Sequence, residues 1–120
     1  MKRTNYNIAC KYQGEFKTVS IPGYVVSVDG LLFGISKWGM FDGKVKKTSN
    51  EEWMITELTT GYACLRWRTT TRQDAIDQMV SMNKWPAIKR TAKDNMKNNV
   101  TLNPDAEPSE HYDVWTTHPE

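Results

Sequence analysis

The dipeptide Asp29-Gly30 constrains the fold more than any other local feature of the sequence. It lies between two runs of β-branched, aliphatic and aromatic residues, YVVSV (24–28) and LLFGIS (31–36). A two-residue hairpin turn needs positive φ at both central positions, which Asp-Gly tolerates well. The sequence therefore predicts an antiparallel hairpin centred on this pair, with Gly34 marking a bulge or a close backbone approach in the second arm.

A second hairpin is expected before this one. Residues 4–13 and 15–21 both alternate between apolar and polar side chains, which is typical of half-buried strands. Gln13-Gly14 interrupts the alternation and is expected to form the turn. Pro22-Gly23 is expected to end the second strand, because both residues favour turns.

The segment after the central hairpin is rich in turn signals. Trp38-Gly39 and Asp42-Gly43 predict a long connection, with a short edge strand at 44–48 whose lysines would discourage edge-to-edge pairing. Residues 53–69 then predict a third hairpin, with its turn at Thr60-Gly61.

Two helices are expected to follow the strands. Thr70 or Thr71 suits an N-cap, and the apolar residues that follow at spacings of three and four predict a helix to about Asn83. A second helix is expected from Pro86 to about Asn98. Its apolar face would comprise Trp85, Ile88, Ala92 and Met96. Strands first and helices last predict the α+β class, with a bent antiparallel sheet of about five or six strands over residues 4–69 and one or two C-terminal helices.

The charge distribution divides the chain into two parts. Residues 1–97 hold all sixteen Lys and Arg against nine Asp and Glu, a net charge of +7, whereas residues 98–120 hold five acids and no Lys or Arg, a net charge of −5. At 120 residues the chain has the length of one domain. We therefore expect a single α+β domain over 1–97 and an acidic, proline-containing tail over 98–120, which either docks on the body or stays free.

The chain shows no targeting or membrane signal. It has no apolar run long enough for a signal peptide or a membrane span, so we expect a cytoplasmic protein without a membrane partner. Cys10 and Cys64 lie far apart without a CxxC pair, and both are expected to be buried or half-buried free thiols.

Catalytic and cofactor signatures are missing from the sequence. It contains no GxxxxGK[ST] phosphate loop and no Gly-x-Ser-x-Gly elbow. His111, Asp113 and His118 are spaced too loosely to predict a metal site. We therefore expect a protein that is not an enzyme and has no cofactor and no metal.

A basic and aromatic strand face is the first candidate binding surface. Alternation over the last predicted strand places Tyr62, Arg66 and Arg68 on one face, and Arg72 follows closely. Guanidinium groups bind phosphates and aromatic rings stack on bases, so this face could bind nucleic acid. The cations Lys89, Arg90 and Lys93 of the second helix would extend it. The alternative is that Arg66 and Arg68 pair across strands with Glu52 or Glu57.

Protein contact is the second candidate. Five tryptophans cannot all be central in so small a core, and tryptophan and arginine are enriched at interface hot spots. Tyr112 and Trp115 are large apolar residues in the tail and are expected to contact a partner or the body.

Residues 51–79, EEWMITELTTGYACLRWRTTTRQDAIDQM, resemble the hairpin-then-helix unit of short accessory proteins of phages and mobile elements. The resemblance implies a stand-alone protein that binds a host protein or ribonucleoprotein complex, as inhibitors of host defence such as anti-CRISPR proteins do. Those inhibitors are often acidic mimics of nucleic acid, whereas this body is basic. We therefore expect a non-enzymatic binding protein, preferably a phage-encoded inhibitor that acts by protein contact in the host cytoplasm, and alternatively a small nucleic-acid-binding domain.

Overall fold

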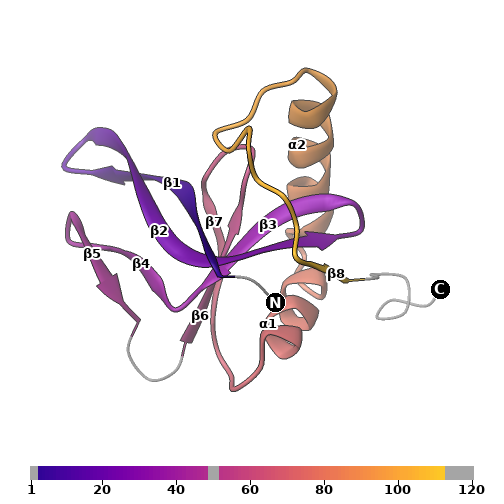
Figure 1. Ribbon diagram of the computed structural model, residues 1–120, viewed down its shortest axis with the longest axis horizontal. Helices are drawn as coiled ribbons and strands as arrows, with labels where there is room; N and C mark the ends of the chain where they lie inside the picture. Colours follow the sequence, from indigo (N-terminus) through magenta and orange to yellow (C-terminus); the bar gives the residue numbers. More distant parts are fainter. Residues whose placement is uncertain (1–2, 49–51, 113–120) are drawn as a thin grey trace.

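The computed structural model describes residues 3–48 and 52–112 (Figure 1). Its elements follow one another as β1 (Thr4–Tyr12), β2 (Glu15–Val28), β3 (Leu31–Ser36), β4 (Trp38–Phe41), β5 (Lys44–Lys47), β6 (Glu52–Glu57), β7 (Ala63–Arg68), α1 (Arg72–Val80), α2 (Trp85–Lys97) and β8 (Glu110–Tyr112).

The main sheet has six strands. Its order is β1-β2-β3-β6-β7 with antiparallel neighbours, and β8 pairs in parallel with the end of β2. β4 and β5 form a separate two-stranded hairpin. The predicted α+β class, with a bent antiparallel sheet and C-terminal helices, is confirmed. The sixth strand, however, comes from the C-terminal segment rather than from residues 4–69.

The predicted turn at Asp29-Gly30 is confirmed. Asp29 has φ of 54° and Gly30 has φ of 79°, and the flanking residues Val28 and Leu31 are directly paired. Both values are positive, as the favoured two-residue hairpin turn requires. The turn chemistry of these two residues therefore sets the register of the central hairpin.

The expected strand end at Pro22-Gly23 is wrong. β2 runs through both residues, pairing with β1 up to Gly23 and with β3 from Tyr24 onward. A side chain at position 23 would overlap Ser36 and the Tyr6 ring, and the Ser36 hydroxyl donates to the Pro22 carbonyl. Tertiary contacts therefore keep the Pro-Gly pair in an extended strand, at the point where the pairing partner of β2 changes from β1 to β3.

The expected turn at Trp38-Gly39 is also wrong. These residues begin β4 and pair with Lys47 and Lys46 of β5. The turn lies only at Asp42-Gly43, and the predicted edge strand is confirmed as β5.

Both helices are confirmed. The Thr71 hydroxyl accepts a hydrogen bond from the Asp74 N–H at 3.2 Å and caps α1. The apolar stripe of α1 is buried, as are Trp85 and Ala92 of α2. Met96, expected on the same apolar face, is 45 % exposed because its end of α2 extends past the strands (Figure 1).

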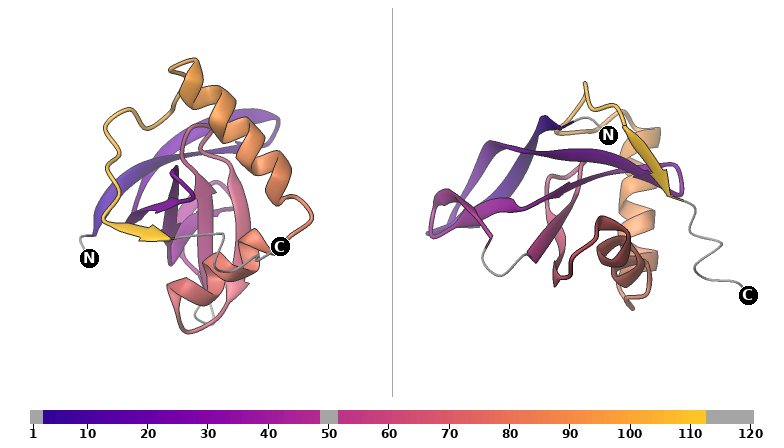
Figure 2. Two further views of the ribbon diagram at one scale, coloured as in Figure 1. Left: turned by 90° about the vertical axis from the view of Figure 1, so that its right-hand side faces the viewer. Right: turned by 60° about the horizontal axis from the view of Figure 1, so that its bottom comes forward.

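The sheet has a core on each face. Helices α1 and α2 cover one face (Figure 2, left). There Val26, Phe33, Ile35 and Ile55 are fully buried against them. On the other face, the folded-over β1–β2 hairpin makes a smaller core with Leu58. This second core comprises Tyr6, Ile8, Ile21, Val25 and Leu58. Burial on both faces explains why apolar residues occupy both faces of the central hairpin.

The C-terminal segment docks on the body as far as Tyr112. The chain returns from α2 across β1 and β2 to β8 (Figure 1), and buried Asn103 bonds to the backbones of Asn7 and Leu58. Of the two alternatives for the tail, docking therefore holds for residues 98–112. Cys10 and Cys64 are half-buried free thiols, as predicted.

Candidate functional site: a basic cleft beside Trp53

Arg66 is engaged within the sheet. It lies opposite Met54 on β6, donates to the Glu52 carboxylate, and places its guanidinium carbon 4.9 Å from the centroid of the Phe41 ring. Cross-strand pairing with Glu52, the simpler alternative from the sequence, is therefore what the structure contains. Glu57, the other suggested partner, is buried and accepts hydrogen bonds from Thr59 and Thr60.

Arg68 and Arg72 lie on different surfaces. Arg68 is exposed on β7, opposite Glu52. Arg72, the first residue of α1, is half-buried, with its Nη2 3.4 Å from the Glu110 carboxylate. Its guanidinium carbon lies 4.6 Å from the centroid of the Tyr24 ring. Arg72 therefore belongs to the helix-covered side of the sheet, away from Phe41 and Arg66.

The cations of α2 form a third group. Lys89 Nζ is 3.2 Å from the Asp29 carboxylate and 5.9 Å from the centroid of the Trp85 ring. Arg90 and Lys93 are exposed. Arg66, Arg72 and Lys89 thus have different acidic partners, and the structure does not bring the cations of β7 and α2 together into one face.

The predicted aromatic contacts are also separated. Tyr62 is 50 % exposed, and its ring centroid lies 6.3 Å from that of Phe16, which is 66 % exposed. Tyr112 lies in β8, where burial and its hydrogen bond to Glu110 raise the pKa of its phenol to about 12. Trp115 lies outside the described residues.

A different set of residues does come together, at the point where β2 bends. A cleft of about 260 Å³, called the basic cleft below, opens between the middle of β2, the ends of β3 and β5, and the starts of β4 and β6. It is lined by Arg3, Pro22, Gly23, Tyr24, Ser36, Lys37, Trp38, Lys47 and Trp53. Three of these residues are cationic, three are aromatic, and none is acidic.

Cations lie over the aromatic rings of the basic cleft. Lys37 Nζ is 4.9 Å from the centroid of the Trp53 ring, and the Arg72 guanidinium carbon is 5.8 Å from the same centroid. Cations at such distances are attracted by the ring quadrupole. Trp53 is therefore the centre of a cluster that holds positive charge at the mouth of a small cleft.

Two donors of this cluster lack an acceptor. Within residues 3–48 and 52–112, neither Trp53 Nε1 nor Arg72 Nε has a hydrogen-bond partner, although both atoms are buried. Trp53 as a whole is only 7 % exposed. Buried donors are satisfied in most native structures, so unpaired ones call for a specific explanation.

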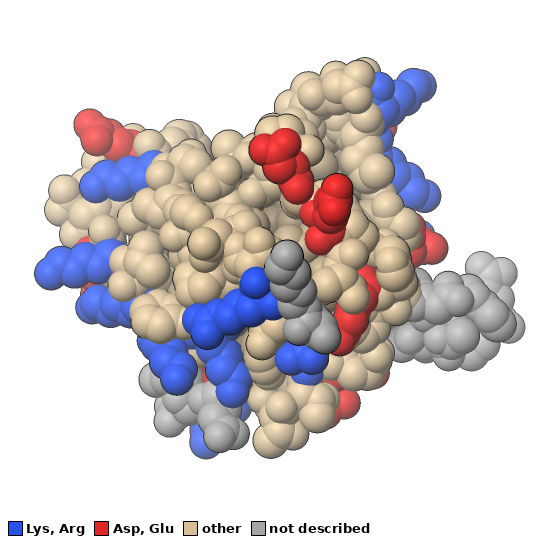
Figure 3. All heavy atoms as spheres, viewed as in Figure 1, with Lys and Arg blue, Asp and Glu red and all other residues tan. Residues whose placement is uncertain are grey.

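Charge is also separated over the whole surface. Lys and Arg side chains gather on the side where β4 and β5 lie, at the lower left of Figure 3, whereas acidic side chains follow the C-terminal segment. The cations of α2 appear at the opposite, upper right edge. The basic cleft and the exposed β5 lysines, Lys44, Lys46 and Lys47, thus share one positive face.

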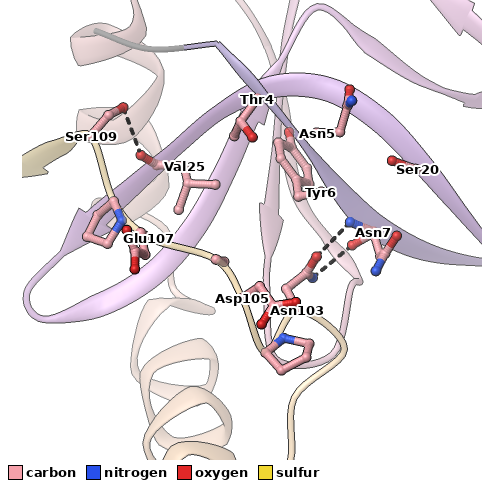
Figure 4. Close-up of a pocket in the computed structure, with 13 residues that line it drawn as sticks. Thr4, Asn5, Tyr6, Asn7, Ser20, Val25, Asn103, Asp105, Glu107 and Ser109 are labelled. Carbon is pink, nitrogen blue, oxygen red and sulfur yellow. Dashed lines mark hydrogen bonds between the residues drawn. The ribbon is translucent and has the colours of Figure 1, made fainter.

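A larger cavity, of about 480 Å³, lies between the β1–β2 hairpin and the C-terminal segment (Figure 4). Asn103 and Asn7 meet across it, and Ser109 bonds to the Val25 carbonyl. These hydrogen bonds fasten the C-terminal segment to the sheet along the cavity.

A shallow groove of about 290 Å³ lies between the start of β7 and α2. Its lining includes Tyr62, Cys64 and Ile88. Burial, and then the charge of nearby Glu57, raise the pKa of the Cys64 thiol to about 12. The groove therefore carries a thiol with a raised pKa and an exposed aromatic ring.

The sequence interpretation missed Arg3, Tyr24, Lys37, Lys47 and Trp53 as site residues. The adjacent pair Lys37-Trp38 and the run KVKK (44–47) were available signals, but they suggested a loop and an edge strand. The pairing of β3 with β6, which sets Ser36 opposite Met54, and of β4 with β5, which sets Trp38 opposite Lys47, brings them beside Trp53.

The comparisons add no family to this description. Models of protein families, curated proteins and solved structures were compared with the chain, and none matches it. Over the described part of the chain, neither helix combines the length and the apolar character that crossing a membrane requires.

Proposed function

We propose that this chain is a non-enzymatic binding protein that holds single-stranded nucleic acid on the positive face around the basic cleft. The observation that carries the proposal is the cluster of Arg3, Lys37 and Lys47 with aromatic rings in a cleft without an acidic lining residue. Nonspecific single-strand binders combine a positive groove that follows the phosphates with aromatic side chains that stack on bases.

The neighbouring surface suits an extended ligand. Lys44 and Lys46 on β5 continue the positive charge on one side of the cleft. On β7, Trp67 lies opposite Trp53 and is 40 % exposed, so its ring is accessible to a base. The nucleic-acid hypothesis from the sequence is thereby kept, with a different set of residues.

The experiment compares two pairs of charge removals. A labelled short single-stranded oligonucleotide is titrated with wild type, with Lys37→Gln/Lys47→Gln, and with Arg90→Gln/Lys93→Gln on α2. The cleft pair should weaken binding at low salt by at least about tenfold, whereas the α2 pair, with the same loss of charge, should change it little. Equal weakening by both pairs would refute a localised site.

A second candidate function is inhibition of a host defence complex by protein contact, as a phage-encoded, anti-CRISPR-like protein acting in the host cytoplasm. The specific observation in its favour is the exposed pair of rings Phe16 and Tyr62 beside the groove on α2. Exposed aromatic pairs of this kind are common at protein interfaces.

Nuclease-treated host lysate tests the second candidate. A defined protein complex that is retained by tagged wild type and lost with Phe16→Ala/Tyr62→Ala would support it. Retention of nothing but nuclease-sensitive material would count against it.

A further inference from the structure

The indole N–H of Trp53 is a hydrogen-bond donor at the basic cleft. It is buried and lacks an acceptor in the described part of the chain, and its residue lines the basic cleft. Leaving a buried donor unpaired is unfavourable, because it has lost its hydrogen bonds to water. A ligand atom that accepts this hydrogen bond would remove that cost.

Arg72 presents a second unpaired donor beside the first. Its Nη2 pairs with Glu110, while its buried Nε has no acceptor among the described residues. The Arg72 guanidinium carbon lies 4.6 Å from the centroid of the Tyr24 ring and 5.8 Å from that of Trp53, and both rings line the cleft, so Arg72 packs against the cleft lining. A planar guanidinium suits phosphate oxygens, which can accept hydrogen bonds from several donors at once.

The surrounding charge favours an anion. Lys37 lies over the Trp53 ring, and Arg3 and Lys47 line the cleft. Arg72 is the fourth cation, and it is paired with the carboxylate of Glu110. Four cations therefore face one carboxylate, so an anion is attracted even with Glu110 in place. The volume of about 260 Å³ lies below the roughly 300–1,000 Å³ of pockets that enclose a drug-sized ligand, which suits a single small group.

We propose that the basic cleft is a phosphate subsite, in which Trp53 Nε1–H and Arg72 Nε–H donate to one phosphate group and Arg3, Lys37 and Lys47 supply counter-charge. The inference rests on the proposed function, since it takes this phosphate from the backbone of the bound strand. The bases then lie outside the cleft, toward Trp67 and β5.

The indole N–H signals in a proton–nitrogen NMR spectrum test the subsite directly. Trp53→Phe assigns the Trp53 signal by its loss. Inorganic phosphate and thymidine monophosphate should shift this signal saturably, whereas thymidine and sodium chloride at matched ionic strength should not. No saturable shift with phosphate, or the same shift with chloride, would overturn the subsite.

Two substitutions outside Trp53 check the assignment while the indole reporter is kept. Arg72→Lys keeps the charge and removes the Nε donor. The phosphate affinity measured from the Trp53 signal should therefore fall by about tenfold. Arg90→Lys, the same substitution on the exposed surface of α2, is the matched control and should leave that affinity unchanged. An Arg72→Lys variant with unaltered phosphate affinity would exclude Arg72 as a donor.

The phosphate experiment tests the subsite, and the oligonucleotide experiment tests nucleic-acid binding, so a negative result in one leaves the other proposal standing. If the oligonucleotide binds but phosphate does not shift the Trp53 signal, the subsite is wrong and nucleic-acid binding remains. If phosphate shifts the signal and the oligonucleotide does not bind, nucleic-acid binding is wrong and the subsite remains. Oligonucleotides with a phosphate or a hydroxyl at the 5′ end should bind equally, and a clear preference for the phosphorylated end would refute a backbone phosphate.

Discussion

At the scale of single residues, Gly34 shows how a missing side chain makes room for the second core. A Cβ at this position would overlap the Tyr6 ring, which packs over the strand there. Over-packing of a buried site typically costs about 1–3 kcal/mol, so Gly34→Ala should lower the free energy of unfolding by about that amount. Denaturant unfolding measures the loss.

The Tyr6→Leu background is the control for this overlap. Residues in contact have non-additive effects on stability, so Gly34→Ala should cost less when the ring is absent. If the cost is the same in both backgrounds, the overlap with Tyr6 is not its cause.

Cys64 gives a second prediction at the residue scale. Because its pKa is raised to about 12, the thiolate is scarce at neutral pH. In a Cys10→Ser variant at about pH 8, the Cys64 thiol of the folded chain should react with a disulfide reagent at least about tenfold more slowly than that of the unfolded chain. A more basic thiolate is a better nucleophile, but the fall in the thiolate fraction is the larger effect.

The same shift predicts a pH dependence of stability. Between the ordinary value of 9.0 and about 12, the unfolded chain releases the Cys64 proton while the folded chain keeps it. Stability is therefore complete below this window and falls as the pH rises through it. Tyr112 adds to the fall at the upper end. Cys64→Ala should flatten the curve relative to wild type, and an identical slope would contradict the assignment.

At the scale of elements, Asn103 fastens the C-terminal segment to the sheet. Its Oδ1 accepts from the Asn7 N–H at 2.6 Å and its Nδ2 donates to the Asn7 carbonyl at 3.0 Å (Figure 4). The Nδ2 also donates to the Leu58 carbonyl at 2.8 Å. Asn103→Ala leaves buried backbone groups unpaired and should cost about 2 kcal/mol or more. Hydrogen exchange of the Asn7 amide should accelerate in parallel.

Asn83, exposed between the helices, provides the control. Asn83→Ala should have little effect on either measurement. If both substitutions have equal effects, Asn103 does not hold the segment in place.

Elements with local causes could be predicted from the sequence. The turn at Asp29-Gly30 and the cap at Thr71 depend on residues within one turn of each other, so their sequence signals suffice. The path of β2 through Pro22-Gly23 depends on Tyr6 and on Ser36, which lies on the next strand. Turn propensity alone therefore gave the wrong boundary.

At the scale of the whole molecule, the candidate site could not be predicted, because it depends on contacts between residues that are far apart in the sequence. The basic cleft combines residues from separate segments, and no motif connects Arg3 with Trp53. The division of charge between the body and the acidic segment was visible in the sequence. The location of the positive face was not, because it depends on how β3 pairs with β6 and β4 with β5, and on ion pairs between distant residues such as Lys89 and Asp29.

The salt dependence of oligonucleotide binding tests the central claim most directly, because each cation that contacts a phosphate contributes to its slope. Contacts from Arg3, Lys37 and Lys47 predict a slope of about −2 in a plot of log affinity against log salt concentration. Lys37→Gln/Lys47→Gln should make the slope shallower by about 1.4, while Arg90→Gln/Lys93→Gln should leave it unchanged. No binding at low salt, or an equal change of slope in both variants, would contradict binding at the basic cleft.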